Sequence, residues 1–200
     1  MTWNKRNILE KMLASMTRVV LKKYDPFIIG VTGSVGKSSA KEAIALALSV
    51  GYSVRKSEGK YNNEIGIPLT VIGAETGGRS WFRWTGIFLK WLGVVLFPVR
   101  YPQVLVLEMG IDRPGDMDAL LRFVPVNIGV ATQVSSSHLA YFGTLQNIAR
   151  EKGRLIAALP EDGFAILNAD DKRTLKMSEK TKATSITYGF DTTADIWADN

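Results

Sequence analysis

Cysteine is absent from this 200-residue sequence, and histidine occurs only once, as His138. Without thiols, the chain can form neither a disulfide framework nor a thiolate metal site, and the absence is typical of cytoplasmic proteins. The sequence also lacks internal repeats and low-complexity tracts. Its N-terminus is basic, but neither a continuous apolar core nor a small-residue cleavage site follows, so we predict no signal peptide.

The composition favours one folded domain, or one domain with an appendage. Apolar residues make up 46% of the chain, which is enough for a sizeable core. The formal net charge is +6, and the sequence pI is about 9.5. A basic surplus suits anionic partners such as nucleotide phosphates, nucleic acid or acidic lipid, and by itself it does not choose among them.

The sequence is organised around a glycine-rich stretch at 30–39, Gly-Val-Thr-Gly-Ser-Val-Gly-Lys-Ser-Ser. An apolar run at 27–29 precedes it and a helical pattern at 40–48 follows it, which is the order of strand, loop and helix in a phosphate cradle. In such a loop, backbone N–H groups and the positive end of the helix point at one anion. Lys37 would reach the outer phosphates, and the Ser38 hydroxyl would contact a magnesium ion.

The match to the general pattern G-x-x-x-x-G-K-[ST] is imperfect, because Val31 stands where that pattern has glycine. The tighter form T-G-x-x-G-K-S is intact. The alternative is a plain Gly/Ser-rich turn, but the strand before it and the helix after it favour a phosphate loop. The loop residues expected to bind the nucleotide are Thr32, Gly33, Ser34, Val35, Gly36, Lys37, Ser38 and Ser39.

Two further apolar runs, at 103–108 and 126–132, are typical of buried strands. Such strands, separated by helices, indicate an α/β fold with a mostly parallel sheet that helices cover on both faces. Ligands of these sheets lie beyond the carboxyl ends of the strands. We therefore expect the phosphate loop, Glu108 and His138 to meet at one edge. Taken singly, Glu108 could be a surface carboxylate and His138 a helix cap.

The remaining pattern predicts a short strand at 52–55, a helix at 145–159 that contains Lys152, and strands at 163–168 and 184–189. The strand at 163–168 ends in a polar residue, as the earlier ones do. No closing element is visible at the C-terminal end of the sequence, so we expect these residues to be a fragment of a longer chain.

Residues 60–68 contain two adjacent asparagines, Asn62 and Asn63, before a glycine and a proline. This composition predicts a loop. Amide side chains both donate and accept hydrogen bonds, so the pair could hold a polar substrate, or it could belong to a plain turn.

Two segments combine apolar and basic residues. Residues 4–23 show helical spacing, and this predicted helix either packs on the domain or lies on an anionic membrane surface. Residues 79–102 are densely aromatic, but their apolar run is short and is interrupted by Lys90, so they do not predict a spanning helix. They form either a helix hairpin buried against the domain or an element at the lipid interface.

Five stretches together resemble the ATP-binding central domain of the Mur ligases, the ADP-forming ligases of peptidoglycan precursor synthesis. They lie in the family's order and spacing, over about residues 27–190, and are far more specific than one phosphate loop. They are Thr-Gly-Ser-Val-Gly-Lys-Ser at 32–38, Tyr-Asn-Asn-Glu-Ile-Gly-Ile-Pro at 61–68, Leu-Glu-Met-Gly at 107–110, Ser-His-Leu-Ala-Tyr-Phe-Gly-Thr-Leu-Gln-Asn-Ile-Ala-Arg-Glu-Lys-Gly at 137–153 and Leu-Pro-Glu-Asp-Gly-Phe-Ala-Ile-Leu-Asn-Ala-Asp at 159–170.

The resemblance implies a P-loop NTPase-like fold and a ligase reaction. ATP would phosphorylate a substrate carboxylate to an acyl phosphate, and an amino group would attack it to form an amide. Lys37 would stabilise charge on the transferring phosphoryl group. Ser38 and Glu108 would hold one Mg²⁺, and His138, Glu108 and a carbamate on Lys152 would hold a second. Without the family, an ordinary solvated side chain is the expected state of Lys152.

The resemblance also implies that Asn168 lies beside the adenine and that Asn62 and Asn63 face the substrate. The implied partners are ATP, a UDP-muramoyl-peptide-like substrate and an amino acid or dipeptide, with no nucleic acid. Positions 140 and 154 depart from the pattern, because they hold alanine and arginine where the family's acidic residues are expected.

The family usually carries an N-terminal domain for the uridine end of its substrate and a C-terminal domain for the incoming amino acid. We divide this chain into an amphipathic helix at 1–24 and a central domain at 25–200 with an aromatic insertion at 79–102. The alternatives are a folylpolyglutamate-type ligase with the same domain and a non-catalytic ATP-binding module at the membrane. We expect a cytoplasmic location, with peripheral contact of 79–102 at the inner face of the membrane.

Overall fold

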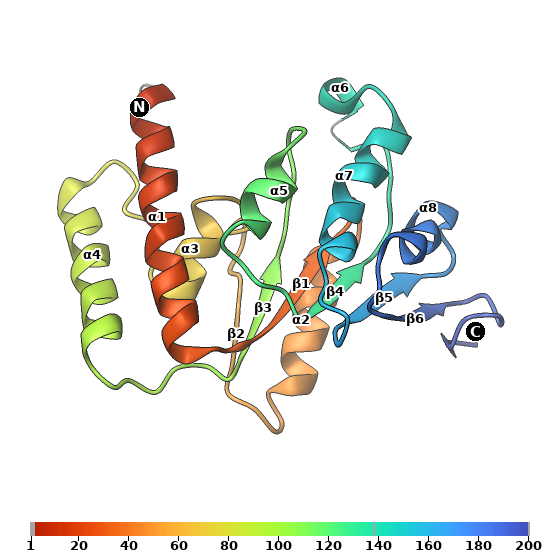
Figure 1. The fold of residues 1–200 in the computed structure, drawn as a ribbon, viewed down its shortest axis with the longest axis horizontal. Coiled ribbons are helices and arrows are strands. Elements are labelled where there is room, and N and C mark those ends of the chain that lie inside the picture. Colours follow the sequence, from red (N-terminus) through yellow and green to blue (C-terminus); the bar gives the residue numbers. More distant parts are fainter. Residues whose placement is uncertain (1–2, 138, 200) are drawn as a thin grey trace.

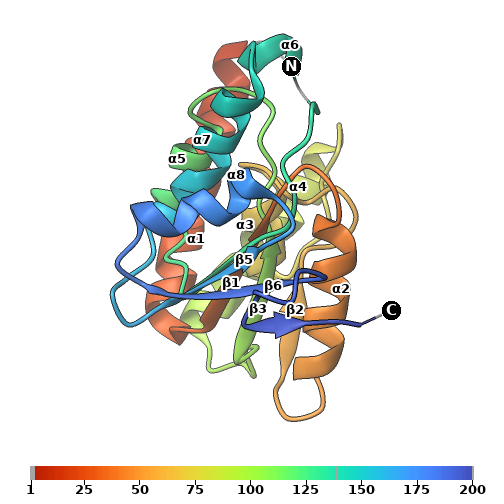
Figure 2. The same ribbon diagram turned by 90° about the vertical axis from the view of Figure 1, so that its right-hand side faces the viewer.

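The computed structural model describes residues 3–137 and 139–199, which form one parallel sheet with helices on both faces (Figures 1 and 2). The strand order is β2-β3-β1-β4-β5-β6-β7, so the first strand lies near the middle of the sheet. The strands are β1 (Phe27–Thr32), β2 (Val54–Lys56), β3 (Val104–Glu108), β4 (Ile128–Ala131), β5 (Phe164–Asn168), β6 (Thr184–Gly189) and β7 (Ile196–Trp197).

Helices alternate with the strands, as the sequence predicts for a parallel sheet. Figure 2 shows α2 on one face of the sheet and α1, α5 and α7 on the other. The helices are α1 (Trp3–Tyr24), α2 (Lys37–Leu48), α3 (Gly66–Ile72), α4 (Trp81–Leu96), α5 (Asp116–Leu121), α6 (Leu139–Phe142), α7 (Leu145–Ala157), α8 (Lys172–Leu175) and the 3-10 helix η1 (Lys176–Lys180).

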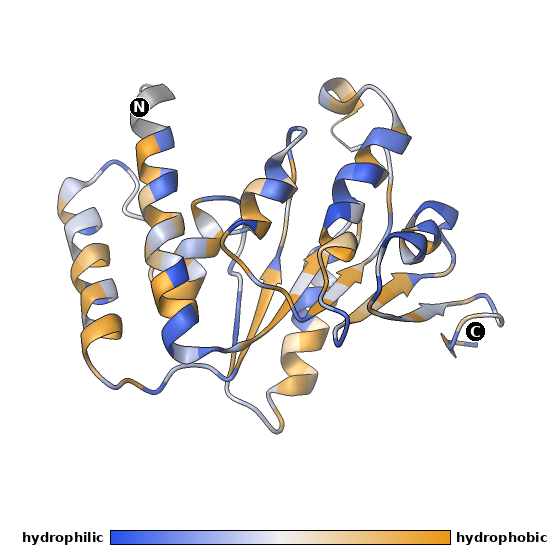
Figure 3. Cartoon of the chain, in the orientation of Figure 1, coloured by the Kyte–Doolittle hydropathy of each residue, from blue (hydrophilic) through white to orange (hydrophobic). Residues whose placement is uncertain are grey.

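The core has two layers, because successive side chains of a strand point to opposite faces of the sheet. In β1, Ile28 belongs to the larger cluster, under α1, α5 and α7. Ile29 and Val31 belong to a smaller cluster that packs against α2. Because both faces of the sheet are buried, the sequences of the central strands are continuous apolar runs (Figure 3). The structure confirms the predicted strands over 27–29, 103–108, 126–132, 163–168 and 184–189.

The segment at 60–68 corrects one expectation, because it is a loop only as far as Ile65. α3 begins at Gly66. The side-chain oxygen of Asn63 accepts hydrogen bonds from the backbone N–H groups of Ile65 and Gly66, at 3.2 and 3.0 Å. Pro68 falls in the first turn, where its missing N–H leaves no bond unmade. All seven residues of α3 are buried, and this burial offsets a sequence of weak helix formers.

The aromatic segment corrects a second expectation, because it forms one helix and not a hairpin. Ser80 caps α4 by accepting a hydrogen bond from the backbone N–H of Arg83 at 3.4 Å. The helix then continues to Leu96, since Gly86 and Gly93 are isolated and the next strong breaker is Pro98. None of the described helices is both long enough and apolar enough to cross a bilayer.

The expected N-terminal helix is confirmed as α1, which packs beside α3 and α4 (Figure 1). Its buried residues include Leu13, Met16 and Val20. The apolar stripe therefore contributes to the fold.

The short strand expected at 52–55 begins and ends slightly later, as β2. The sequence did not predict α5, α6 or β7.

Candidate active site

The loop between β1 and α2 has the conformation that its glycines allow. Gly33 has φ +146°, and a Cβ there would lie 1.9 Å from Oγ1 of Thr132. Gly36, at the start of α2, has φ +83°. The loop is anchored to the end of β4, because the Ser34 N–H donates to the Gln133 carbonyl at 2.5 Å. The N-terminus of a twelve-residue helix thus opens onto this edge of the sheet, and such a terminus attracts anions.

Lys37 and Ser38, the first residues of α2, point in different directions. The Lys37 ammonium donates to the Ser34 carbonyl at 3.4 Å, so it folds back over the loop. The Ser38 hydroxyl donates to Oε2 of Glu108 at 2.8 Å. The loop after β1 and the end of β3 therefore meet, because the two strands are neighbours in register, with Val31 opposite Glu108.

Glu108 is 4% exposed, and both of its oxygens have partners. Besides Ser38 on Oε2, it accepts a hydrogen bond on Oε1 from Nδ2 of Asn62 at 3.2 Å. This one carboxylate joins the phosphate loop to the asparagine loop before α3. The surface-carboxylate interpretation of Glu108 is wrong, because the side chain is buried between two loops.

Lys41 also reaches this carboxylate, and the sequence reasoning missed it. Its Nζ lies 3.7 Å from Oε2 of Glu108 and donates to the Ser57 carbonyl at 2.7 Å. The Ser57 hydroxyl in turn accepts from the Glu108 backbone N–H at 3.2 Å. The available signal was spacing: Lys41 stands four residues after Lys37, so both lie on neighbouring turns of one helix face.

Lys152, in α7, is 2% exposed, so the expectation of a solvated lysine is wrong. Its Nζ donates to the Gly33 carbonyl at 2.8 Å, which places the amine against the phosphate loop. Burial, reinforced by the positive charge of Lys37, lowers the pKa of Lys152 to about 7, although Asp112 and Glu151 oppose the shift. A large fraction of this amine is therefore uncharged at neutral pH.

A cavity of about 610 Å³ adjoins these groups, although Ser38, Lys41 and Glu108 are not among the residues that line it. Lys37, Lys152, Asn62 and Asn63 line it, and Tyr141 lies on its wall. The remaining lining residues come from the loops after β1 and β3, from the asparagine loop, from α5, from the loop before α6 and from α1. They are Asn7, Glu10, Gly33, Glu64, Gly110, Ile111, Asp112, Arg113, Asp116 and Ser137.

Outside the phosphate loop, one described residue of the predicted site is not part of this constellation. Asn168 ends β5, where its side-chain oxygen accepts a hydrogen bond from the backbone N–H of Asp170 at 2.9 Å, and it is not among the residues that line the cavity. His138 lies outside the described residues.

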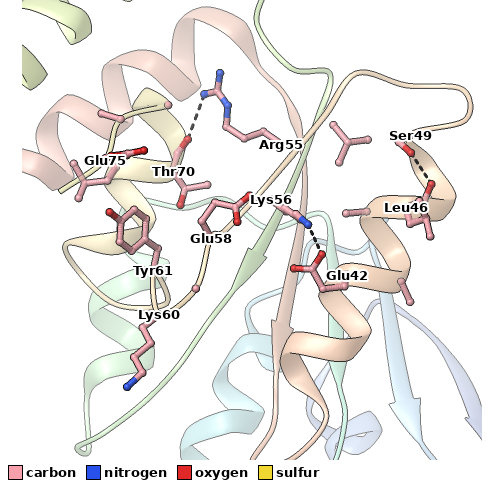
Figure 4. A pocket seen from close by; sticks show the side chains of 17 residues that line it. Glu42, Leu46, Ser49, Arg55, Lys56, Glu58, Lys60, Tyr61, Thr70 and Glu75 are labelled. Carbon is pink, nitrogen blue, oxygen red and sulfur yellow. Dashed lines mark hydrogen bonds and ion pairs between the residues drawn. The ribbon is translucent and has the colours of Figure 1, made fainter.

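A larger hollow, of about 910 Å³, lies elsewhere on the molecule, between α2, β2 and α3 (Figure 4). Some of its lining residues interact with one another: Lys56 pairs with Glu42, and Arg55 donates to the Thr70 carbonyl at 3.3 Å. None of the predicted site residues that the structure describes lines it. Convergent polar groups therefore identify the smaller cavity as the candidate site, although it is not the larger of the two.

The candidate site offers hard oxygen donors to a cation. Within residues 3–137 and 139–199, no three His, Asp or Glu side chains gather as a metal cluster. Ser38 and Glu108 supply two protein oxygens, and this small set fits Mg²⁺, which keeps several waters and shares phosphate oxygens. The arrangement can therefore hold a metal between a bound phosphate chain and the asparagine loop.

Position 154, where the sequence departs from the expected acidic residue, has a structural role. Arg154 forms ion pairs with Asp118 and with Glu151, the latter at 3.1 Å. Glu151 is itself buried, and it accepts hydrogen bonds from the backbone N–H groups of Gly115 and Met117 at 2.9 and 3.1 Å. The sequence signal was an i,i+3 charge pair on a helix. The pair fixes α5 against α7, next to Lys152.

Comparison with known proteins places the chain in a family. The sequence model described as the Mur ligase middle domain matches residues 95–200. The UDP-N-acetylmuramoyl-tripeptide–D-alanyl-D-alanine ligase of Mycobacterium tuberculosis (strain H37Rv) is 34% identical over 171 residues, which are 86% of this chain and 29% of the relative. The same-named protein of Bacillus subtilis is 31% identical over 80% of this chain and 30% of its own length.

Among solved structures, the MurF ligase of Thermotoga maritima in complex with ADP has a TM-score of 0.72 and 28% identity. The match covers 91% of this chain and 37% of that one. The chain spans less than a third of the length of the curated relatives it matches. The family match covers more than half of these 200 residues, and the chain belongs to the Mur ligase family, in the region of its middle domain.

Proposed function

We propose that this chain is the ATP-binding part of an ADP-forming amide ligase that acts in peptidoglycan precursor synthesis. The observation that carries the proposal is the double engagement of Glu108, with Ser38 of the phosphate loop on one oxygen and Asn62 on the other. A simple phosphate-binding loop needs only the first contact. The second ties the phosphate site to a loop that can present an acceptor.

In the proposed reaction, a carboxylate oxygen of the acceptor attacks the γ-phosphorus of ATP, and the bond to the β-phosphate oxygen breaks. This yields an acyl phosphate and ADP. The nitrogen of an incoming amine then attacks the acyl carbon, loses a proton and expels inorganic phosphate. Lys37 would stabilise the charge of the transferring phosphoryl group, while the loop N–H groups, Asn168 and the residues from Thr32 to Ser39 hold the nucleotide.

Magnesium fits the proposed site at Ser38 and Glu108, where it would neutralise charge between the phosphates and the acceptor carboxylate. A second ion would be held by Glu108, by His138 and by a carbamate on Lys152. A carbamate forms from a neutral amine and CO₂, and the lowered pKa of Lys152 favours that neutral amine. The modification would turn a cation into an oxygen ligand suited to Mg²⁺.

The named relatives supply the proposed substrates, a UDP-N-acetylmuramoyl-tripeptide and D-alanyl-D-alanine. A folylpolyglutamate-type ligase is less well supported, because the Escherichia coli FolC structure in complex with DHPP and ADP shares only the fold, at 17% identity and a TM-score of 0.56.

We also propose the division into a helix at 1–24 and a domain at 25–200 with an insertion at 79–102. The proposed location is the cytoplasm, with contact at the inner face of the membrane.

Two measurements test the proposal. In the complete encoded protein, phosphate release should require both the muramoyl tripeptide and D-alanyl-D-alanine, and folate with glutamate should not replace them. Dependence on folate and glutamate would select the other ligase. ATP binding without phosphate release in the presence of either pair would instead indicate the non-catalytic module.

Lys37→Ala tests the phosphate site directly. Removing this charge-assisted contact should weaken MgATP binding by well over tenfold, since such contacts contribute about 1.5–3 kcal/mol. Calorimetry measures the change, and Lys60→Ala, which removes a lysine outside the candidate cavity, is the matched control. Equal ATP affinity of both variants and the wild type would overturn the phosphate-loop assignment.

A further inference from the structure

The positive charge of this chain is concentrated in α1, α4 and the residues next to α4. Residues 3–24 and 79–102 together carry ten Lys and Arg but only one acidic residue, Glu10. The rest of the chain carries fifteen Lys and Arg against eighteen Asp and Glu. The net charge of +6 therefore arises entirely from these two segments, and the remainder of the molecule is weakly acidic.

The same two helices form one layer at the outer edge of the molecule (Figure 1). Trp91 of α4 donates its indole N–H to the Met16 carbonyl of α1 at 3.0 Å. Lys23 of α1 donates to the carbonyls of Val94 and Phe97 at 2.9 and 2.8 Å, so it caps the C-terminal end of α4. A cation at this position also complements the helix dipole. These contacts hold the C-terminal halves of the two helices together.

α4 exposes large apolar side chains in spite of this packing. Only Ile87 of this helix is buried. Trp81 is 75% exposed, Phe82 83% and Leu89 60%, and Phe88, Leu96 and Phe97 are exposed as well. Figure 3 shows that the C-terminal half of α4 is mostly hydrophobic, although the helix lies at the edge of the fold. A contiguous apolar face of this kind on a surface helix indicates an interaction site.

Arginines stand among these apolar side chains. Arg79, Arg83 and Arg100 are exposed, and the sequence holds no acidic residue between Thr76 and Leu107. Aromatic rings beside exposed cations suit the boundary between lipid headgroups and acyl chains, where each ring meets an apolar and a polar layer. An apolar protein partner would explain the exposed rings, but it would not explain the absence of acidic residues.

We propose that the face formed by α4 and its flanking arginines, residues 79–100, docks on an anionic lipid surface. In this arrangement the helix lies in the plane of the interface, with its exposed apolar side chains toward the acyl chains and its arginines toward the headgroups. This inference deepens the proposed location at the membrane and stands apart from ligase activity. ATP binding therefore serves as an independent readout of an intact domain.

Sedimentation with lipid vesicles tests the proposal on the complete encoded protein. The protein should bind vesicles of phosphatidylglycerol mixed with phosphatidylcholine and should bind vesicles of phosphatidylcholine alone far more weakly. Binding should also weaken when salt is raised to about 1 M, where the Debye length falls to about 3 Å. The emission of Trp81 should shift to the blue on binding, and Trp81→Phe should remove much of that shift.

Two sets of charge variants distinguish binding through this face from nonspecific electrostatic binding by the whole protein. Arg79→Gln, Arg83→Gln and Arg100→Gln combined should lower binding by about a hundredfold, since each basic residue near the surface contributes about fivefold. Lys172→Gln, Lys176→Gln and Lys180→Gln combined remove the same charge from α8 and η1 and should change binding less than about threefold. Equal losses in both sets would mean that net charge alone carries the binding, and would overturn the proposal.

A second comparison, between two double variants, tests how much the exposed apolar side chains contribute to vesicle binding. Phe82→Ser with Leu89→Ser should lower vesicle binding at least tenfold and leave ATP affinity unchanged. The control combines Leu46→Ser with Val50→Ser, two exposed apolar residues of the α2 region. It should leave vesicle binding and ATP affinity unchanged. No vesicle binding by the wild type would overturn the proposal. So would concentration-dependent dimers that Phe82→Ser abolishes, in favour of a second copy as the occupant.

Discussion

The carboxyl edge of the sheet and the layer of α1 and α4 differ in which side chains they bury and which they expose. At the edge, charged side chains are buried and each has a partner: Lys41 and Glu108 lie 3.7 Å apart, and Lys152 donates to the Gly33 carbonyl. In the helical layer, apolar side chains such as Trp81 and Phe82 are exposed. A buried charge is tolerated only with partners, whereas an apolar side chain can remain in water at a moderate free-energy cost. The buried charges at the edge thus have partners within the chain, whereas nothing among the described residues covers the exposed apolar side chains of the layer.

Lys152→Ala tests the chemistry of the edge and should have the largest effect. Ligation by the complete encoded protein should fall by about a thousandfold or more, which corresponds to about 4 kcal/mol of activation free energy. ATP affinity should change by less than about threefold, because Lys37 and the loop N–H groups remain. Coupled phosphate-release assays and calorimetry measure the two quantities.

Lys176→Ala, an exposed lysine of η1, is the control for that change and should leave both quantities unaltered. Added formate or acetate should restore part of the lost activity by supplying carboxylate oxygens in place of the proposed carbamate. Near wild-type ligation by Lys152→Ala would show that neither the carbamate nor the second metal site is needed.

Lys41→Met tests whether buried pairing stabilises the edge. The variant leaves the Glu108 carboxylate buried without its nearest cation, and removing one partner of such a pair costs about 3–5 kcal/mol. We expect the lower end, about 3 kcal/mol in the free energy of unfolding, because Ser38 and Asn62 still donate to Glu108. Urea unfolding measures it.

Lys56→Met is the matched control for Lys41→Met. Lys56 forms a surface pair with Glu42, and solvent screening makes the contribution of exposed pairs to stability small, so Lys56→Met should lose far less stability than Lys41→Met. If both variants lost the same stability, burial would not distinguish the edge from the surface, and the contrast between the two regions would fail.

The sequence predicted the edge better than the helical layer, and the reason is physical. Strand, loop and helix are contiguous around 27–48, and a parallel sheet brings the ends of all its strands to one edge, so the meeting of Ser38 with Glu108 followed from topology. Lys41 was missed because a lysine on a helix is ordinarily solvated, and only the three-dimensional packing under β3 shows it to be buried.

In the helical layer, composition alone could not decide between a hairpin and one helix. The segment at 79–102 is apolar on nearly every side, so it lacks the periodicity that separates a buried face from an exposed one. α3 was missed for a different reason, because its start depends on the side chain of Asn63, which caps the turn. Such local hydrogen bonds leave no repeating pattern in a sequence.

Stability at alkaline pH offers a finer test of the buried edge. The pKa of Lys152 is lowered to about 7 in the folded protein, whereas the unfolded chain has the ordinary lysine value of about 10.4. Between these values the unfolded state binds one more proton, so stability rises with pH and the charged, buried amine destabilises the fold below about pH 7. A buffer free of CO₂ keeps the amine unmodified.

The comparison is between wild type and Lys152→Met, which keeps a long side chain without a titrating group. From about pH 7.5 to about 8.5, the wild type should gain about 1 kcal/mol of unfolding free energy relative to the variant, because a full difference of one proton gives about 1.4 kcal/mol per pH unit. Parallel curves for both proteins would show that the amine keeps an ordinary pKa.

Trp91→Phe addresses the helical layer and should have the smallest effect. The change keeps an aromatic ring but removes the indole N–H that donates to the Met16 carbonyl, a bond between α4 and α1. A single neutral hydrogen bond of this kind contributes about 0.5–1.5 kcal/mol, so we expect a loss of about 1 kcal/mol or less in urea unfolding, with ATP affinity unchanged. Trp81→Phe changes an exposed ring of the same helix and should leave stability unaltered. A loss above about 3 kcal/mol for Trp91→Phe would mean that α4 is an integral part of the core, and the contrast with the sheet edge would then disappear.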